Sequence, residues 1–240
     1  MTSYQVSSRR HRPNTFSEIL GQDMVVSILK NSLRLNRSAH AYIFSGIRGT
    51  GKTTLARVFA KALNCQSPTE NQEPCNQCAI CKEISLGTSM DVMEIDGASH
   101  RGIEDIRQIN ETVLFVPSKS RYKIYIIDEV HMLTKEAFNS LLKTLEEPPA
   151  HVKFFLATTE IAKIPNTISS RCQKMLLKRI PEETIIDKLT TIAKLGKIEA
   201  SREALLPIAK AAQGSLRDAE SLYDYVVGLF PESFTPEDTA

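Results

Sequence analysis

The 240-residue chain lacks a long hydrophobic run, an excess of charge of one sign and an apolar leader. No stretch of about 18 apolar residues occurs, which excludes a transmembrane helix of ordinary length. Residues 1–12 are polar and basic, without the apolar core of a secretion signal. Lys and Arg number 30 against 28 for Asp and Glu, so any DNA contact must come from local clusters rather than from a general field. We therefore expect a cytoplasmic protein.

Cysteine is scarce, but four of the five cysteines lie close together. Cys65, Cys75, Cys78 and Cys81 follow a C-x₉-C-x₂-C-x₂-C spacing in a polar stretch. Cytoplasmic cysteines stay reduced, and four thiolates match tetrahedral structural zinc. A redox C-x-x-C pair, a disulfide and an iron–sulfur cluster remain open alternatives. Cys172, the fifth cysteine, is expected to be a small buried hydrophobe.

What the chain does have is a 42% apolar content, enough for a full core, and an alternation of strand-like and helix-like patterns. Ile, Val, Phe and Tyr are concentrated in four runs, which are 41–45, 92–96, 123–128 and 152–158. Amphipathic stretches separate these runs, and Pro148-Pro149 ends one of them. This pattern predicts an α/β domain over residues 1–178, with a parallel sheet flanked by helices.

The strand signal disappears after residue 178, where three helical patterns follow. Apolar stripes run through 185–192 and 204–212, and a third helix begins near Ser215. Gly214 suits the end of the second helix, and Ser215 with Asp218 resembles a capping box. We predict a small helical domain over 179–240. Thr235-Pro236 looks like the start of another helix, so we expect the sequence to be a fragment of a longer chain.

A phosphate-binding motif follows the first strand. The pattern G-x-x-x-x-G-K-[ST] is met in a strand–loop–helix context, and Thr54 follows it; its residues are Gly46, Ile47, Arg48, Gly49, Thr50, Gly51, Lys52 and Thr53. Glycines allow backbone N–H groups to surround phosphate oxygens, and the following helix directs its dipole at the same anion. Lys52 supplies positive charge for the β- and γ-phosphates, and Thr53 is a ligand for Mg²⁺. A glycine-rich turn that binds nothing is the alternative.

An acidic pair ends the third strand, where ligands of open α/β sheets bind. Asp128 is predicted to hold Mg²⁺, and Glu129 to orient and polarise the attacking water. The alternative is that the pair only caps the next helix. Together with the phosphate loop, the pair favours an ATPase.

Together with other segments, these motifs resemble the gamma/tau clamp-loader family of bacterial DNA polymerase III, whose members are AAA+ motors. The resemblance extends through nearly the whole chain and is carried by these segments: Arg12-Pro13 with Phe16 and Gly21-Gln22, the phosphate loop, 127–133, 138–149, 156–159, Ser170-Arg171-Cys172 and 214–219. It implies an AAA+ nucleotide-binding domain with a five-stranded parallel sheet and a small all-α lid. It also favours zinc for a module at about 64–82, and implies that the family's third, collar domain is absent.

The resemblance also implies roles for single residues. Thr159 resembles the sensor-1 residue, Arg217 the sensor-2 arginine, and Arg171 the arginine finger that reaches a neighbouring subunit's γ-phosphate in trans. Each of these residues also has an ordinary explanation that does not need the family. Thr159 would be present for its strand propensity, Arg171 would be a surface charge, and Arg217 would pair with Glu220. The family's N-terminal segment lines the adenine side of the site, which here falls on Arg12, Pro13, Ile19 and Leu20.

The implied function is an ATP-hydrolysing clamp-loader subunit that loads a sliding clamp onto primed DNA. The implied partners are the delta and delta-prime subunits, further gamma/tau copies, the clamp and primer–template DNA. Arg101, Arg107 and Lys143 are candidate DNA contacts, although most such charges are solvated. Two alternatives remain, a non-hydrolysing subunit like delta-prime and an AAA+ branch-migration helicase. The intact Lys52-Thr53 and Asp128-Glu129 argue against the first, and the cysteine insertion argues against the second.

Overall fold

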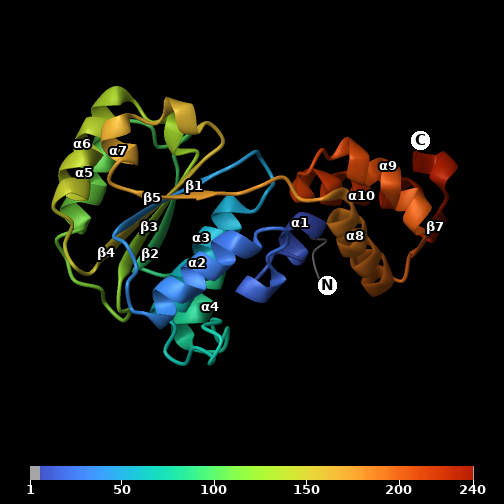
Figure 1. The fold of residues 1–240 in the computed structure, drawn as a ribbon, viewed down its shortest axis with the longest axis horizontal. Coiled ribbons are helices and arrows are strands. Elements are labelled where there is room, and N and C mark those ends of the chain that lie inside the picture. The colour runs from blue at the N-terminus through green and yellow to red at the C-terminus, as the bar shows by residue number, and fades with distance from the viewer. Residues whose placement is uncertain (1–5, 240) are drawn as a thin grey trace.

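A computed structural model describes residues 6–239, so residues 1–5 and 240 of the two predicted domains lie outside the described residues. An α/β unit is followed by a helical unit (Figure 1). Within residues 6–239, the helices are too short or too polar to span a bilayer.

A five-stranded parallel sheet forms the centre of the first unit. Its strands are β1 (Ala41–Ser45), β2 (Val92–Asp96), β3 (Lys123–Asp128), β4 (Val152–Thr158) and β5 (Gln173–Leu176), in the order β2-β3-β4-β1-β5. The four runs predicted from the sequence are confirmed at their predicted bounds. Since all strands are parallel, their carboxyl ends meet at one edge, where the segments after β1, β3 and β4 lie together.

Helices cover both faces of the sheet (Figure 1). One face carries α2 (Asp23–Arg34), α3 (Lys52–Asn64) and α4 (Ala79–Leu86), and the other carries α5 (Ile103–Thr112), α6 (Lys135–Glu146) and α7 (Asn166–Ser169). Successive strand residues alternate between the two cores: Tyr42 packs with α3, whereas Ile43 packs with α6. Burial on both faces explains why the strands are continuous apolar runs.

The helical unit has a core of its own. It consists of α8 (Glu182–Gly196), α9 (Arg202–Ala211) and α10 (Leu216–Leu229), which confirms the three predicted helices. The Ser215 side chain accepts a hydrogen bond from the Asp218 N–H at 3.3 Å, as the predicted cap requires. A short parallel pair, β6 (Glu199–Ala200) with β7 (Ser233–Phe234), was not predicted. At Thr235-Pro236, where the sequence predicts the start of another helix, the structure has a short 3₁₀ helix, η4 (Pro236–Thr239).

Residues 7–20, which we call the N-terminal strap, run between the two units (Figure 1). The strap contains α1 (Ser7–Arg10) and a 3₁₀ turn, η1 (Phe16–Glu18). At its start, the Ser7 N–H donates to Asp224 Oδ2 of α10 at 2.7 Å. Just after it, Gln22 exchanges two hydrogen bonds with the backbone of Lys178, at 2.8 and 2.9 Å. The strap therefore connects the lid helices to the sheet unit.

Candidate nucleotide-binding site

A cavity of about 350 Å³ lies at the carboxyl edge of the sheet, bounded by the strap, the loop after β1, the end of β3 and the start of α10. The predicted site residues that line it are Arg12, Pro13, Ile19, Leu20, Arg48, Gly49, Thr50, Gly51, Lys52, Thr53, Thr54, Asp128, Glu129 and Arg217. Further lining residues, which the sequence reasoning missed, are Ser8, Arg9, His11, Glu94, Ile180, Leu216 and Glu220. The walls of one cavity thus consist of the strap, the phosphate loop, the end of β3 and the start of α10, which are far apart in the sequence.

The loop between β1 and α3 has the backbone shape of an anion-binding loop. Gly49 and Gly51 have φ of +78° and +92°, a left-handed region that favours glycine, and Gly51 caps the start of α3. Lys52 Nζ donates to the carbonyl oxygens of Gly46 at 3.0 Å and Ile47 at 2.9 Å. The loop therefore folds around its own lysine, with Gly46 and Ile47 forming its base.

Lys52 is a buried cation, with 6% of the residue exposed. Burial lowers the pKa of its ammonium group, and the nearby carboxylates of Glu129 and Asp128 oppose this shift. Lys52 lines the cavity, where its buried ammonium group can balance the charge of a bound phosphate.

Thr53 and Asp128 meet across the cavity floor. The Thr53 hydroxyl donates to Asp128 Oδ2 at 2.7 Å, although the two residues lie on different elements, α3 and β3. A hydroxyl and a carboxylate at this separation offer the oxygen ligands that Mg²⁺ prefers. The residue pair predicted for Mg²⁺ is therefore brought together, and its donor set fits that ion.

Glu129 has an uncommon backbone conformation, with φ of +45° directly after β3. A left-handed conformation at a residue other than glycine costs free energy and occurs often at functional sites. Its Oε2 accepts a hydrogen bond from Thr159 Oγ1 at 3.2 Å and lies 3.4 Å from His131 Nδ1. The buried His131 ring is in turn 3.1 Å from Thr158 Oγ1 and 3.3 Å from Glu160 Oε1. The residues after β4 thus fix the direction of the Glu129 carboxylate.

The start of α10 lies directly against the phosphate loop. A Cβ atom added to Gly49 would lie 1.9 Å from Ser215 Oγ and 3.2 Å from Arg217 Cβ. Arg217 follows Ser215 on α10 and lines the cavity beside the loop. On the strap side, Arg12 Nε donates to Thr54 Oγ1 at 3.0 Å, and burial is the main cause that lowers the pKa of Arg12.

Arg171 does not belong to this cavity. It follows α7, donates to the Thr167 carbonyl at 2.7 Å and pairs with Glu146 at the end of α6 at 2.7 Å. Its side chain is 37% exposed. Of the predicted catalytic residues, Arg171 is the one that the fold holds away from the chain's own site and presents on the surface.

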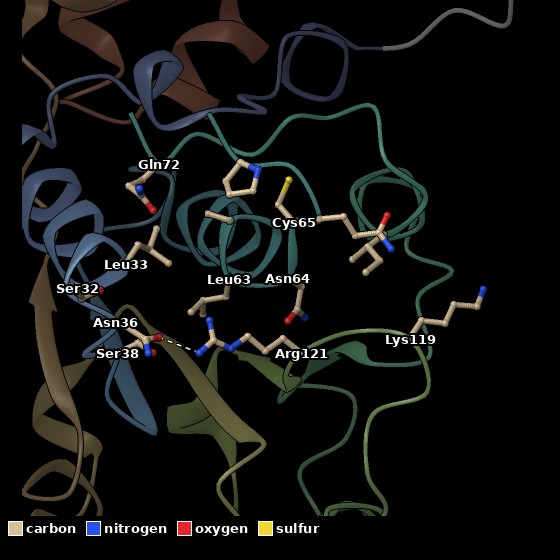
Figure 2. Close-up of a pocket in the computed structure, with 14 residues that line it drawn as sticks. Ser32, Leu33, Asn36, Ser38, Leu63, Asn64, Cys65, Gln72, Lys119 and Arg121 are labelled. Atoms are coloured by element: carbon tan, nitrogen blue, oxygen red, sulfur yellow. Dashed lines mark hydrogen bonds between the residues drawn. The ribbon is translucent and has the colours of Figure 1, made fainter. Parts of the chain in front are cut away.

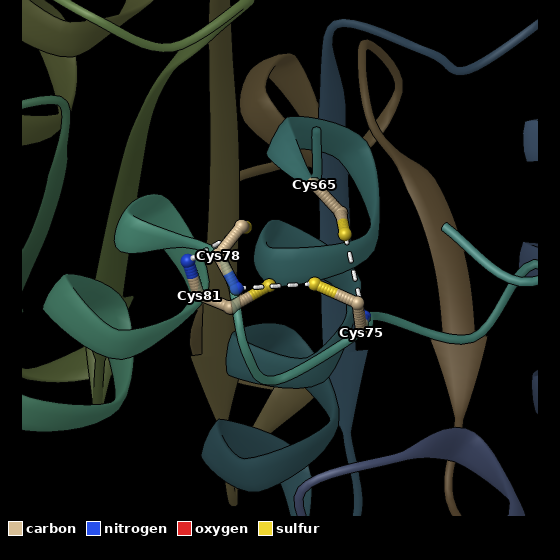
Figure 3. A group of neighbouring side chains, drawn as sticks. All are labelled: Cys65, Cys75, Cys78 and Cys81. Carbon is tan, nitrogen blue, oxygen red and sulfur yellow. Dashed lines mark hydrogen bonds between the residues drawn. The ribbon is translucent and has the colours of Figure 1, made fainter. Parts of the chain in front are cut away.

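The four clustered cysteines converge at the far end of α3 (Figure 3). Their sulfur atoms all lie within 4.8 Å of one another, and residues 65–78 link α3 to α4 around them. Backbone N–H groups donate hydrogen bonds to several of these sulfurs. The Cys75 N–H donates to Cys65 Sγ, and the Cys78 N–H donates to Cys75 Sγ, each at 3.3 Å. Burial opposes ionisation of Cys75, but the N–H groups of Cys78 and Gln77 outweigh it and lower its pKa to about 6. The geometry and the donors fit one tetrahedral metal ion.

Burial raises the pKa of the other two affected thiols of the cluster, Cys65 and Cys81. Burial also raises the pKa of Cys172, to about 12, and its sulfur lies in the core beside α6, which confirms the small buried hydrophobe expected from the sequence.

A second hollow, of about 300 Å³, lies beside the cysteine cluster (Figure 2). Its walls include Cys65, Asn64 and Gln72, and Arg121 Nη2 donates to Asn36 Oδ1 at 2.9 Å across it. Because α3 begins at Lys52 and ends at Asn64, this hollow lies at the opposite end of α3 from the phosphate loop. It is therefore separate from the nucleotide cavity.

The fold and the cavity define the class of the chain as a domain with a phosphate-binding P-loop and the AAA+ fold. The Thermotoga maritima RuvB Holliday junction branch migration motor has a similar fold, with a TM-score of 0.69 over 95% of this chain and 70% of that chain, at 20% sequence identity. At that identity, the likeness concerns the fold alone.

The sequence places the chain more narrowly. A family model described as "DNA polymerase III, delta subunit" matches residues 21–181, and one described as "DNA polymerase III clamp loader subunit, ATPase lid domain" matches residues 184–228. The chain is 48% identical to DNA polymerase III subunit tau of Bacillus subtilis (strain 168) over 98% of its own length and 42% of that protein. It is 49% identical to subunit gamma of Buchnera aphidicola subsp. Acyrthosiphon pisum (strain APS) over 95% of its length and 63% of that protein.

The chain therefore belongs to the family of DNA polymerase III clamp-loader subunits of the gamma/tau type. It spans less than two thirds of the length of these two relatives.

Proposed function

We propose that the chain is the ATP-hydrolysing part of a clamp-loader subunit, which uses ATP binding and hydrolysis to load a sliding clamp onto primed DNA. The observation that carries the proposal is the meeting of Lys52, Thr53, Asp128 and Glu129 at one edge of the sheet. In the proposed reaction a water molecule attacks the γ-phosphate and gives ADP and phosphate. Glu129 orients this water and polarises it, while Lys52 and the N–H groups of the phosphate loop balance the charge that develops.

The remaining site residues divide into two groups. Thr53 and Asp128 would hold Mg²⁺, which when bound neutralises charge on the phosphates. The hydrogen bond from Thr159 to Glu129 supports a sensor-1 role, and the place of Arg217 in the cavity wall supports a sensor-2 role. Arg12, Pro13, Ile19 and Leu20 form the side for the adenine base.

Arg171 acts on a neighbouring subunit in this proposal. Its exposed position away from the chain's own cavity supports an arginine finger in trans. The proposed neighbours are delta, delta-prime and further gamma/tau copies, with the clamp and primer–template DNA as the other partners, all in the cytoplasm. We place the boundary between the nucleotide-binding domain and the lid at residues 178 and 179.

We further propose that Cys65, Cys75, Cys78 and Cys81 hold structural zinc within a cysteine module of residues 64–82. The convergence of four sulfurs within 4.8 Å supports this proposal. Metal analysis should find one zinc ion per chain and no absorption in the visible range. A brown protein would instead indicate an iron–sulfur cluster.

The test of the proposed ATP site is a binding measurement on Lys52→Ala. Calorimetry with ATP and excess Mg²⁺ should give clear binding for the wild type and at least a ~10-fold weaker affinity for the variant, because a charge-assisted contact to phosphate is lost. Lys194→Ala, which removes an exposed lysine from α8, is the matched control. No heat for the wild type would overturn the proposal.

The two alternatives have separate signatures. Since one matching family model is described as a delta subunit, a non-hydrolysing subunit is the stronger of them, and equal ATP affinity of Lys52→Ala and wild type would favour it. Strand displacement by the purified chain would favour a branch-migration helicase; the structural relative is titled a Holliday junction branch migration motor.

A further inference from the structure

The cysteine module contains a segment that cannot hold its own shape. Residues 65–78 contain neither helix nor strand, and most of their side chains are exposed or half-buried. A polar segment of this kind gains little from hydrophobic burial, so a metal ion held by its cysteines would fix its conformation. Within it, a turn is closed by the Thr69 N–H to the Glu73 carbonyl at 3.0 Å and by the Glu73 N–H to Thr69 Oγ1 at 3.1 Å. This turn presents the Glu73 side chain two residues before Cys75.

The Glu73 carboxylate holds the N-terminal strap. It accepts hydrogen bonds from the backbone N–H groups of Phe16 at 2.6 Å and Ser17 at 3.1 Å, which open the η1 turn. Lys30 of α2 pairs with the same carboxylate at 2.7 Å, and only 13% of the Glu73 side chain is exposed. Hydrogen bonds to an ionised, shielded carboxylate are among the strongest in proteins. Glu73 is therefore a firm attachment point for the strap.

A second contact reinforces the first. Asn76, which lies between Cys75 and Cys78, donates to the Asn14 carbonyl at 3.3 Å. Lys61 of α3, a residue that is 2% exposed, donates to Asn76 Oδ1 at 2.7 Å and to Asn14 Oδ1 at 3.1 Å. The cysteine module thus holds strap residues 14–17 at two separate points.

The held segment lies between the two parts of the strap that line the nucleotide cavity. Arg12 and Pro13 come before it, and Ile19 and Leu20 come after it. A shift of residues 14–17 must therefore move the strap wall of the cavity. The phosphate loop, on the opposite wall, is fixed independently by β1 and α3.

We propose that Glu73 is a positioning residue for the nucleotide, and that metal binding by the four cysteines sets nucleotide affinity through it. In the metal-bound module the turn that carries Glu73 is fixed, and the strap wall is held against the base and sugar of the nucleotide. When the cysteines lose their metal, the strap wall loosens while the phosphate loop keeps its shape. The inference rests on the proposed nucleotide site and deepens it.

The test compares two ligands on the metal-loaded chain, namely ATP and inorganic tripolyphosphate, each with Mg²⁺. For Glu73→Ala we expect about a 3- to 30-fold weaker affinity for ATP, in the range by which a residue outside a site alters binding. The affinity for tripolyphosphate should stay at the wild-type value, because that ligand lacks the base and sugar that the strap wall is proposed to hold. Glu70→Ala is the matched control: this exposed residue lies on the same segment and forms no hydrogen bond with the rest of residues 6–239.

Each other outcome has a defined meaning. Unchanged ATP affinity of Glu73→Ala overturns the inference. An equal loss for both ligands also overturns it, because it indicates general loss of the fold. If wild type fails to bind ATP at all, the proposed function fails instead.

A second arm addresses the metal. Treatment with a chelator that prefers zinc to magnesium, at excess Mg²⁺, should weaken ATP binding of the wild type by at least the factor found for Glu73→Ala, because the contact of Asn76 with the strap loosens as well. The same treatment should weaken ATP binding of Glu73→Ala by a smaller factor than that of the wild type, since the Glu73 contact is already absent. Additive effects of chelation and substitution would separate the metal from Glu73 and contradict the coupling.

Discussion

At the scale of the residue, the site depends on carboxyl groups in contrasting surroundings. Glu129 is held by Thr159 and His131 at the mouth of the cavity. Glu220, on α10, also lines the cavity but is only 5% exposed, and burial raises its pKa to about 7, with Asp224 adding to the effect and Lys188 opposing it. The Glu220 carboxyl group is therefore stabilised in its protonated form.

Replacing Glu129 by Gln should separate binding from hydrolysis. The amide keeps the size of the side chain but cannot polarise water, so steady-state hydrolysis in the assembled complex should fall by about 10²- to 10⁴-fold, with ATP affinity within a few-fold of wild type. Glu136→Gln, at an exposed position early in α6, is the control. Hydrolysis at the wild-type rate by Glu129→Gln would exclude Glu129 as the catalytic carboxylate.

Glu220 should make the stability of the chain depend on pH. Its folded pKa of about 7 lies above the ordinary value of 4.5, so the folded state binds the proton more tightly than the unfolded state. The free energy of unfolding should therefore fall as pH rises from about 4.5 to about 7, by up to ~3 kcal/mol from this group. In Glu220→Gln this fall should disappear, which urea denaturation without nucleotide measures. Glu232→Gln, at an exposed position, should keep the wild-type profile, and identical profiles for Glu220→Gln and wild type would contradict the prediction.

At the scale of the element, the decisive contact is between the phosphate loop and the start of α10. Both Gly49 and Gly51 have positive φ, but a Cβ on Gly49 would strike Ser215, whereas a Cβ on Gly51 meets no described atom within 4 Å. A substitution at Gly51 therefore introduces backbone strain alone, whereas a substitution at Gly49 introduces backbone strain and a clash with α10.

Substituting alanine at each glycine tests this contact. Gly51→Ala should lower the free energy of unfolding by about 1–2 kcal/mol, the cost of a left-handed alanine. Gly49→Ala should lower it by a further ~1–3 kcal/mol, because Ser215 and α10 must move. Urea denaturation without nucleotide gives both values. If the two variants lose equal stability, α10 does not press on the loop in solution.

The elements found from the sequence are those with a repeated apolar pattern. β1, β3, β4 and α8 to α10 have long buried stripes, and each was located. Both edge strands have a single buried residue, Val92 in β2 and Met175 in β5, but β2 keeps the apolar run Val92-Met93 with Ile95, whereas β5 begins with Gln173-Lys174 and was missed. Helix α4 begins inside the cysteine module, and the polar residues before it hid its start. The pair of β6 with β7 is two residues long and depends on tertiary contacts.

The site residues that the sequence predicted are likewise those that belong to a recognisable local pattern. Residues in a contiguous motif, such as Lys52 and Asp128, were identified because their chemistry requires a fixed spacing. Glu220 and His11 carry no local signal, since only the folded chain brings them to the cavity. Glu94 was detectable in principle, because it lies in a predicted strand near the edge that holds Asp128, and it pairs with Arg57.

At the scale of the whole molecule, Arg171 is exposed and lies away from the chain's own cavity, and in the proposed function it completes the site of a neighbouring subunit. In the assembled complex, Arg171→Ala should lower the rate of ATP hydrolysis by about 10³-fold or more. Arg202→Ala, which removes an exposed lid arginine paired with Glu183 and Asp187, is the control. The isolated wild-type chain should hydrolyse ATP slowly. A rate for the isolated chain equal to that of the complex would show that no finger in trans is needed.

The strand order also constrains synthesis on the ribosome. β1, which leads into the phosphate loop, is the first strand of the sheet to be synthesised. In the described chain it pairs with β4 and β5, which are the last two strands of that sheet to be synthesised. A nascent polypeptide that has not reached Val152 has no partner strand for β1, so the phosphate loop after β1 cannot adopt its folded conformation. Nucleotide capture during translation must therefore wait until most of this domain has emerged, and premature termination upstream of β4 leaves an apolar edge open to chaperones.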